Sequence, residues 1–266
     1  MAENAIVLDK LTKSFGGLTA VDDCSFAVPR GTITGLIGPN GAGKTTVFNM
    51  IAGFLKPTSG RILYEGRDVT GATPEELFGL GIVRTFQIPH EFKRMTVLEN
   101  LMLVPPGQSG ENLFNAWLRW SRVRREEQAV RQRADEVLEK LRITNIRDEL
   151  AGQISGGQKK LLELGRTMMT DAKVVLLDEP GAGVNRTLMA ELADMIRQLN
   201  TEEGYTFCII EHDMDLIAEL CDPVIVMAEG TVLTQGRMED IRRDERVLEA
   251  YLGTTGAAEL EAEMTS

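Results

Sequence analysis

The chain has 266 residues, 43% of them hydrophobic and 26% charged, which is the composition of an ordinary globular protein. Its formal net charge of −11 argues against nucleic acid as a main partner and against electrostatic adhesion to anionic lipid. No apolar stretch reaches the roughly 18 residues needed to cross a bilayer, and residues 1–4 lack the features of a signal peptide. We therefore expect a cytosolic protein that works at a membrane only by docking on another protein. The scattered Cys24, Cys208 and Cys221 predict neither a disulfide framework nor a zinc site.

The first 70 residues are typical of short strands separated by turns. Strand-like runs at residues 6–8, 25–28 and 32–34 are interrupted by glycine and proline, and residues 53–70 add a further β section. We expect an antiparallel layer that leads into a buried strand over residues 31–37.

A phosphate-binding loop follows that buried strand. It has the pattern G-x-x-x-x-G-K-T and consists of Gly38, Pro39, Asn40, Gly41, Ala42, Gly43, Lys44 and Thr45. The glycines allow successive backbone N–H groups to point at phosphate oxygens, Lys44 adds a positive charge, and the Thr45 hydroxyl can ligate Mg²⁺. A helix expected over residues 46–52, starting at Thr46, directs its positive N-terminus at the same phosphates. The chain is therefore predicted to bind ATP or GTP.

From about residue 74 to residue 170 the hydrophobic pattern is mostly helical. Residues 121–141 form the clearest helix of this region. Its apolar stripe consists of Ala129, Val130, Ala134, Val137, Leu138 and Leu141. We expect an inserted helical subdomain over about residues 88–170.

Residues 173–227 return to alternating strands and helices. Strands are expected at residues 173–177, 206–210 and 224–227, and helices at 186–199 and 214–220. This alternation predicts an α/β fold with a parallel sheet whose faces are covered by helices. We expect residues 1–253 to be a single domain and residues 254–266 to be a disordered acidic tail.

Two carboxylates, Asp178 and Glu179, end the apolar run that begins at Val174. Parallel sheets bind ligands at the carboxyl ends of their strands. Asp178 can therefore hold Mg²⁺, and Glu179 can polarise the water that attacks the γ-phosphate. The alternative is an exposed acidic turn after a core strand, and the phosphate loop favours the catalytic interpretation.

A second exposed helix N-terminus is predicted at Ser155, Gly156, Gly157 and Gln158, ahead of a helical run over residues 159–169. Its free N–H groups can bind an anion. Because the chain already has one phosphate-binding helix start, we expect two copies of the chain to share each nucleotide, head to tail. The alternative is an ordinary Ser-Gly-Gly loop.

The motifs occur in the order and at the approximate spacings of the ATP-binding subunits of ABC transporters, which the chain resembles to about residue 253. The resemblance implies a P-loop NTPase core, an ABC ATPase, that hydrolyses ATP with Mg²⁺ in a head-to-tail dimer with a second, identical or related ATPase subunit. It implies that residues 155–158 contact the γ-phosphate bound by the opposite subunit, that Gln87 reaches Mg²⁺ and the attacking water, and that His212 acts at the γ-phosphate. It also implies that Phe15 stacks on adenine, the alternative being a phenylalanine packed under the first strands.

One branch of that family, which serves branched-chain amino-acid importers, is similar in two further features. Asn185 replaces the aspartate usual in the wider family, and residues 105–122 form an insertion that contains Trp117 and Trp120. The close alternative is a lipopolysaccharide-export ATPase, and a more distant one is a soluble ABC ATPase that acts on ribosomes or DNA. Asn185 and the insertion with its two tryptophans favour amino-acid import over the exporter. A single ATPase unit without a long coiled-coil insertion, together with the acidic charge, argues against the soluble ATPase.

The importer resemblance implies partners that the chain does not contain. They are transmembrane permease subunits and, indirectly, a substrate-binding protein. We expect the permeases to dock in a groove near residues 87–98, with Ile88, Phe92, Met95 and Val97 as apolar anchors. The alternative is that the region around Met95 is ordinary core. The chain is thereby expected at the cytoplasmic face of the inner cell membrane, as a peripheral subunit.

Overall fold

The computed structural model describes residues 3–85, 91–106 and 120–252. The chain divides into two compact units. The first comprises residues 1–87, 173–182 and 193–266, and the second comprises residues 88–172 and 183–192. In the described ranges, no helix combines the length and the apolar composition that crossing a membrane requires.

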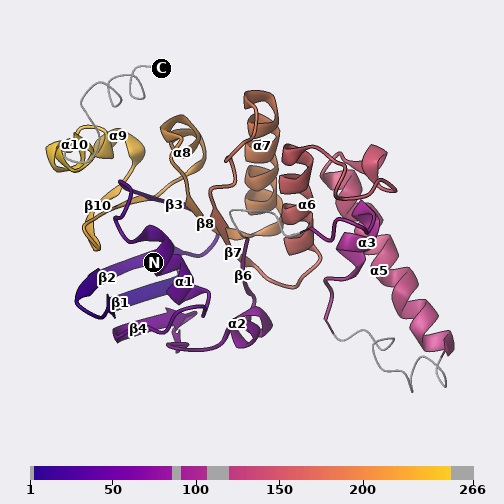
Figure 1. Cartoon of the computed structure of the whole chain (residues 1–266), viewed down its shortest axis with the longest axis horizontal. Coiled ribbons are helices and arrows are strands. Elements are labelled where there is room, and N and C mark those ends of the chain that lie inside the picture. The colour runs from indigo at the N-terminus through magenta and orange to yellow at the C-terminus, as the bar shows by residue number, and fades with distance from the viewer. Residues whose placement is uncertain (1–2, 86–90, 107–119, 253–266) are drawn as a thin grey trace. The chain divides into compact units, whose positions relative to one another are not determined.

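The first unit contains two sheets (Figure 1). The smaller one is antiparallel, in the order β2 (Leu18–Pro29), β1 (Asn4–Phe15), β4 (Ser59–Tyr64) and β5 (Arg67–Asp68). The larger one has the order β10 (Thr231–Gly236), β9 (Val224–Ala228), β3 (Ile33–Ile37), β8 (Thr206–Ile210), β7 (Val174–Asp178) and β6 (Ile82–Arg84). Its strands β9 to β6 are parallel, and β10 pairs antiparallel with β9. Strands β3, β7 and β8 are buried at every position, because a parallel strand is covered on both faces.

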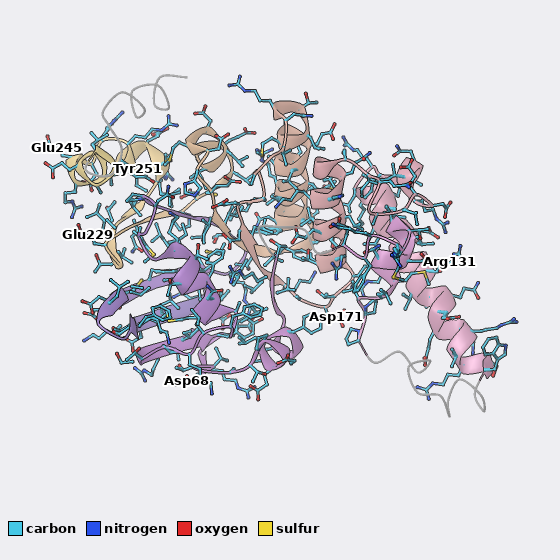
Figure 2. All side chains as sticks on the ribbon, in the orientation of Figure 1. Asp68, Arg131, Asp171, Glu229, Glu245 and Tyr251 are labelled. Atoms are coloured by element: carbon cyan, nitrogen blue, oxygen red, sulfur yellow. The ribbon has the colours of Figure 1, made fainter. Side chains whose placement is uncertain are left out.

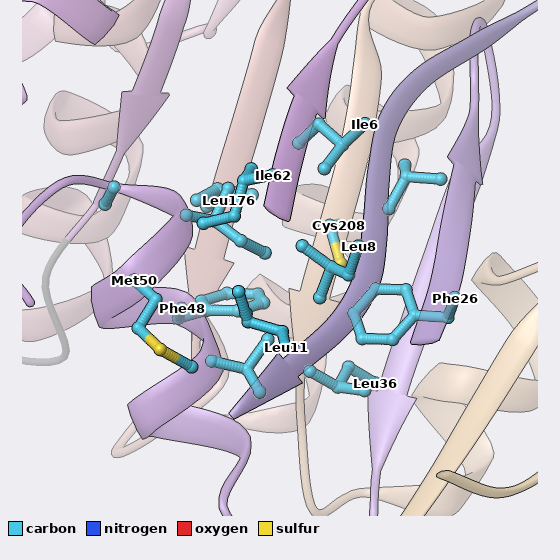
Figure 3. Close-up of a cluster of buried hydrophobic side chains, with 14 of the residues drawn as sticks. Ile6, Leu8, Leu11, Phe26, Leu36, Phe48, Met50, Ile62, Leu176 and Cys208 are labelled. Carbon is cyan, nitrogen blue, oxygen red and sulfur yellow. The ribbon is translucent and has the colours of Figure 1, made fainter. Parts of the chain in front are cut away.

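Both sheets contribute to one hydrophobic core, together with helix α1 (Lys44–Ile51). Figure 3 shows Phe48 and Met50 of α1 among side chains of β1, β4 and β7. The labelled members of this cluster are Ile6, Leu8, Leu11, Phe26, Leu36, Phe48, Met50, Ile62, Leu176 and Cys208. The core therefore fixes α1, and with it the phosphate loop that precedes it, against the parallel sheet.

The described part of the first unit also contains the helices α2 (Pro74–Leu80), α8 (Met214–Leu220), α9 (Met238–Ile241) and α10 (Glu245–Leu252). Glu245 and Tyr251, labelled in Figure 2, lie on α10. Helix α7 (Arg186–Glu203) begins in the second unit and continues into the first.

The second unit is helical, with α3 (Val97–Met102), α5 (Trp120–Lys140), a short 3₁₀ turn (Thr144–Ile146) and α6 (Gly156–Met168). Gly165 marks the close approach of α6 to its neighbours, since a Cβ there would lie 2.7 Å from Leu141 and 3.2 Å from both Leu101 and Val137. The predicted helix over 121–141 is present, but Ala129 is exposed rather than part of the apolar stripe. Figure 2 places the exposed Arg131 on the same helix.

One strand within the expected helical region was not predicted, and the start of one helix needs correction. Residues 74–170, expected to be mostly helical, contain α2, α3, α5 and α6, but residues 82–84 form β6, which joins the parallel sheet. Three residues are too few to reveal a period, and Gly81 ends α2 immediately before them. The helix predicted over residues 46–52 begins earlier, at Lys44, because Gly43 adopts the left-handed conformation that starts it. The predicted acidic tail over residues 254–266 lies outside the described residues.

Candidate nucleotide-binding site

Four adjacent parallel strands carry the polar residues of the site at one edge of the sheet. In the order β3, β8, β7 and β6, they end at the phosphate loop, at Glu211–His212, at Asp178–Glu179 and at Arg84. Since the strands are parallel, their carboxyl ends meet at the same edge, which is where open α/β sheets bind ligands.

The phosphate loop is held in a shape that glycine permits. Gly38, Gly41 and Gly43 have φ values of 147°, 83° and 97°. A Cβ at Gly38 would lie 2.0 Å from the carbonyl oxygen of Met227, and one at Gly43 would lie 2.6 Å from that of Ala20. The backbone therefore packs too closely for a side chain at these two positions. At Gly41 a Cβ would meet nothing within 4 Å, so the loop is open there.

Helix α1 begins at the end of this loop without a side-chain cap. Its first backbone N–H groups therefore remain suited to an anion. Thr45 is exposed and Thr46 is partly exposed in the first turn. Elsewhere in the loop, Asn40 is exposed, whereas Pro39 and Ala42 are buried.

Lys44 is buried, with its side chain turned along the loop. Its Nζ donates hydrogen bonds to the carbonyl oxygens of Gly38 at 2.5 Å and Pro39 at 3.1 Å. Burial lowers the pKa of Lys44, and the carboxylates of Glu179 and Asp178 oppose this shift. The two carboxylates therefore contribute to the electrostatic field at the phosphate loop.

Glu179 and His212 form a pair at the ends of β7 and β8. His212 Nε2 lies 3.2 Å from Glu179 Oε1. Glu179 has a φ of 49°, which is an uncommon, strained conformation for a residue with a side chain. Its backbone N–H donates to the carbonyl of Ile210, so the strained residue is tied to β8. This arrangement can orient a carboxylate toward a water molecule.

Glu211 was missed by the sequence reasoning. The residue is only 5% exposed. Oε1 accepts the backbone N–H of Gly181 at 2.6 Å, and Oε2 accepts the backbone N–H of His212 at 2.9 Å. One buried carboxylate thus connects the loop after β7 to the loop after β8. A glutamate directly after an apolar strand was the signal that could have identified it.

Arg84 was also missed. Its Nη2 donates to Asp178 Oδ2 at 2.6 Å, and its Nη1 donates to Asn49 Oδ1 at 2.6 Å. The available signal was a single arginine at the end of the apolar run before the predicted Gln87. Gln87 itself lies outside the described residues.

The second predicted helix start, Ser155–Gln158, lies in the second unit and begins α6. The Gln158 N–H donates to Ser155 Oγ at 3.3 Å, and the Ser155 N–H donates to Gln158 Oε1 at 2.8 Å, forming a capping box. A Cβ at Gly156 would meet nothing within 4 Å, whereas one at Gly157 would lie 1.6 Å from Leu188 Cδ2. Packing against Leu188 therefore explains the glycine at position 157, and open space surrounds the one at 156.

Asn185 has a local structural role. Its Oδ1 accepts the backbone N–H of Leu188 at 3.0 Å, at the start of α7. This is the usual bond of a helix N-cap, for which asparagine and aspartate are equally suited. The departure from aspartate thus preserves the cap while removing a charge.

The aromatic and apolar positions differ in accessibility. Phe15 is 45% exposed at the end of β1, with Lys13 Nζ 5.0 Å from its ring centre, so the alternative of a phenylalanine packed under the first strands is wrong. Among the predicted docking anchors, Phe92 is 51% exposed and Met95 is partly exposed. Val97 is completely buried and belongs to the core, while Ile88 lies outside the described residues.

A family model described as ABC transporter matches residues 21–182. The chain belongs to the ABC transporter family. A second model, described as branched-chain amino acid ATP-binding cassette transporter, matches residues 231–257 of this chain, which we call the cassette from here on. These residues include β10 and α9. The predicted family, the α/β P-loop fold and the ATPase class are therefore confirmed.

Individual relatives agree with the family models. The cassette is 43% identical over 247 residues to the probable branched-chain amino acid transport ATP-binding protein LivG of Archaeoglobus fulgidus, covering 91% of this chain and 93% of that protein. It is 38% identical over 253 residues to the high-affinity LivG protein of Salmonella typhimurium, covering 95% and 99% of the two chains.

A solved structure extends the agreement to the backbone. The crystal structure of the ADP conformation of an ATP-binding cassette of an ABC transporter aligns with a TM-score of 0.80 at 38% identity, over 94% of this chain and 99% of that one. A nucleotide-free cassette aligns with a TM-score of 0.79, also at 38% identity, over 93% and 98% of the two chains.

Proposed function

We propose that the cassette is the ATP-hydrolysing, energy-coupling subunit of an ABC importer for branched-chain amino acids or related small polar compounds. The observation that carries this proposal is the Glu179–His212 pair, 3.2 Å apart, at the same sheet edge as the phosphate loop. The match of residues 231–257 to the branched-chain amino acid transporter model supports the importer branch.

The phosphate loop fits a nucleotide triphosphate. Gly38 and Gly43 leave no room for a Cβ, so the backbone can turn its N–H groups inward, and the uncapped start of α1 adds further donors. Lys44 would bind the β- and γ-phosphates, and the exposed Phe15 offers a stacking surface for adenine.

The donor set of Thr45 and Asp178 fits Mg²⁺, because a hydroxyl and a carboxylate are the oxygen ligands that this ion prefers. When bound, the metal would neutralise negative charge on the phosphate oxygens. Gln87, which lies outside the described residues, is proposed as a further ligand from the family resemblance.

Hydrolysis then depends on the chain's own bases. Glu179 would accept a hydrogen bond from the attacking water and polarise it. With the proton on Nε2, His212 would donate a hydrogen bond to Glu179 Oε1 or to a γ-phosphate oxygen, depending on which is closer in the loaded state. Glu211 would keep both loops in place through its two backbone hydrogen bonds.

The second helix start explains why we expect two subunits. Gly156 is exposed and faces open space at the N-terminus of α6, so a phosphate of another copy can approach it. We propose that two ATPase subunits, identical or related, close head to tail around two nucleotides, and that hydrolysis reopens them. Docked permease subunits would hold the pair at the cytoplasmic face of the membrane and connect it to a substrate-binding protein.

The catalytic assignment is tested with Glu179→Gln. We expect this variant to bind ATP, to lose nearly all hydrolysis and to accumulate as a dimer in ATP during gel filtration. The matched control is Glu65→Gln, since Glu65 also has a left-handed backbone, with a φ of 48°, but lies in the turn before β5. Wild-type turnover in Glu179→Gln would refute the assignment. Lys44→Ala should lose nucleotide affinity, and unchanged binding would refute the role of the phosphate loop.

The transport assignment is tested by purifying the tagged chain from native membranes in mild detergent. Two amino-acid permease-type subunits with a second ATPase would support the importer. Lipopolysaccharide-export permeases would move the assignment to that exporter, and purely soluble partners would contradict a transporter.

A further inference from the structure

Arg84 is a buried charged side chain with several fixed contacts near the site. Only 6% of its side chain is exposed, and the same is true of Asp178. Its Nη2 bonds to Asp178 and its Nη1 bonds to Asn49 of α1. Its Nε, also buried, has no hydrogen-bond partner among the described residues. The guanidinium is therefore held at its two terminal nitrogens, between β7 and α1.

Two aromatic rings hold the same guanidinium. Its central carbon lies 5.8 Å from the ring centre of Phe48 and 5.9 Å from that of Phe54. Phe48 is fully buried, whereas Phe54 is 47% exposed. Phe54 and Arg84 also line a pocket of about 330 Å³, together with Leu77, Phe78, Ile82 and Val83. One side chain thus connects the wall of an open pocket to the Asp178 carboxylate.

The pairing has a consequence for metal binding. Arginine is permanently protonated, so its charge cannot be removed when a second cation arrives. A carboxylate that ligates Mg²⁺ while bonded to a guanidinium shares its negative charge between two cations, which repel each other. Asp178 is buried, and screening by solvent between the two cations is therefore weak.

We propose that Arg84 is a positioning residue that holds the Asp178 carboxylate when no metal is bound and weakens its affinity for Mg²⁺. The strength of the Arg84–Asp178 ion pair depends on the position of the guanidinium. Phe54, which lines the pocket, helps to fix that position. The inference rests on the proposed function, because it takes Asp178 as a metal ligand.

The test measures binding of a fluorescent ATP analogue to the full chain as free Mg²⁺ is varied, and again in EDTA. Arg84→Met removes the charge and keeps much of the side-chain length. We expect its half-saturating Mg²⁺ concentration to fall by about tenfold, because the repulsion between the guanidinium and the metal is then removed. Binding in EDTA should stay unchanged, because the phosphate loop holds the nucleotide there. A purely structural role would change both conditions together.

The matched control is Arg61→Met. Arg61 forms an ion pair of the same length, 2.6 Å, with Asp9, but its side chain is 62% exposed and it belongs to the antiparallel sheet. This variant should keep the wild-type Mg²⁺ midpoint. An unchanged Mg²⁺ midpoint for Arg84→Met would overturn the proposal. A raised midpoint would overturn it as well, because Arg84 would then assist metal binding.

Phe54→Ala provides a second test in case Arg84→Met fails to fold. This variant keeps Arg84 as the buried partner of Asp178. Loosening the guanidinium by one cation–π contact should lower the Mg²⁺ midpoint by about threefold. No change in this variant would also contradict the proposal. If wild-type binding shows no dependence on Mg²⁺, the proposed role of Asp178 fails instead, and loss of binding in Lys44→Ala still tests the phosphate loop separately.

Discussion

Gly41 and Gly43 offer a test of how the phosphate loop is built. Both have left-handed backbones, with φ values of 83° and 97°, so an alanine at either position incurs a similar conformational cost of about 1–2 kcal/mol. Their surroundings differ. A Cβ at Gly41 has nothing within 4 Å, whereas a Cβ at Gly43 lies 2.6 Å from the backbone oxygen of Ala20 and 3.2 Å from Val21 Cγ2.

The contact between a Cβ at Gly43 and the backbone oxygen of Ala20 sets the difference in stability between the two variants. Ordinary contact begins at 3.4 Å, so the Cβ at Gly43 would intrude on the Ala20 oxygen by 3.4 − 2.6 = 0.8 Å. That oxygen belongs to the backbone of β2 and cannot rotate away. Overpacking of this kind costs about 1–3 kcal/mol. We therefore expect Gly43→Ala to lower the free energy of unfolding by about 2–5 kcal/mol, and Gly41→Ala by about 1–2 kcal/mol.

The assay is equilibrium unfolding in urea, without nucleotide, with both variants compared to the wild type. Omitting nucleotide separates the packing cost from any loss of binding. If both variants lose the same free energy within about 0.5 kcal/mol, the close approach of Ala20 contributes nothing and the reasoning is refuted.

Three further predictions concern other parts of the chain. Ser155→Ala removes the acceptor for the Gln158 N–H and should lower the free energy of unfolding in urea by about 1 kcal/mol, and no loss would contradict the capping role. Leu138→Ala opens a cavity at a fully buried position of α5 and should cost about 2–5 kcal/mol in the same assay, whereas Ala129→Ser on the exposed face should be nearly neutral. Burial raises the pKa of the Cys24 and Cys221 thiols to about 12, so a thiol reagent at pH 8 should react with them only after unfolding, and rapid labelling of the native protein would contradict their burial.

Local sequence determined the parts of the site that are contiguous in the chain. The phosphate loop needs glycines, a lysine and a threonine at fixed spacing because its backbone wraps one anion, and these residues are neighbours in sequence. Asp178 and Glu179 were predicted for a similar reason, since an apolar run that ends in carboxylates marks the end of a buried strand. The helix over Met214–Leu220 and the strand over Thr206–Ile210 were also predicted with the bounds observed.

Tertiary structure decided which of these strand ends are neighbours. Arg84 and Asp178 are separated by 94 positions in the chain, yet they form a buried ion pair because β6 and β7 are adjacent. Parallel strands that pair are joined by long connections, so the local sequence does not show which strands are neighbours. A strand as short as β6 also carries no periodic hydrophobic pattern of its own. The glycine at position 157 is a second case, because the side chain that excludes a Cβ there belongs to Leu188, on another helix. Sequence thus determined the chemical groups available to the site, and only packing between distant segments decided their partners, because those contacts have no local pattern.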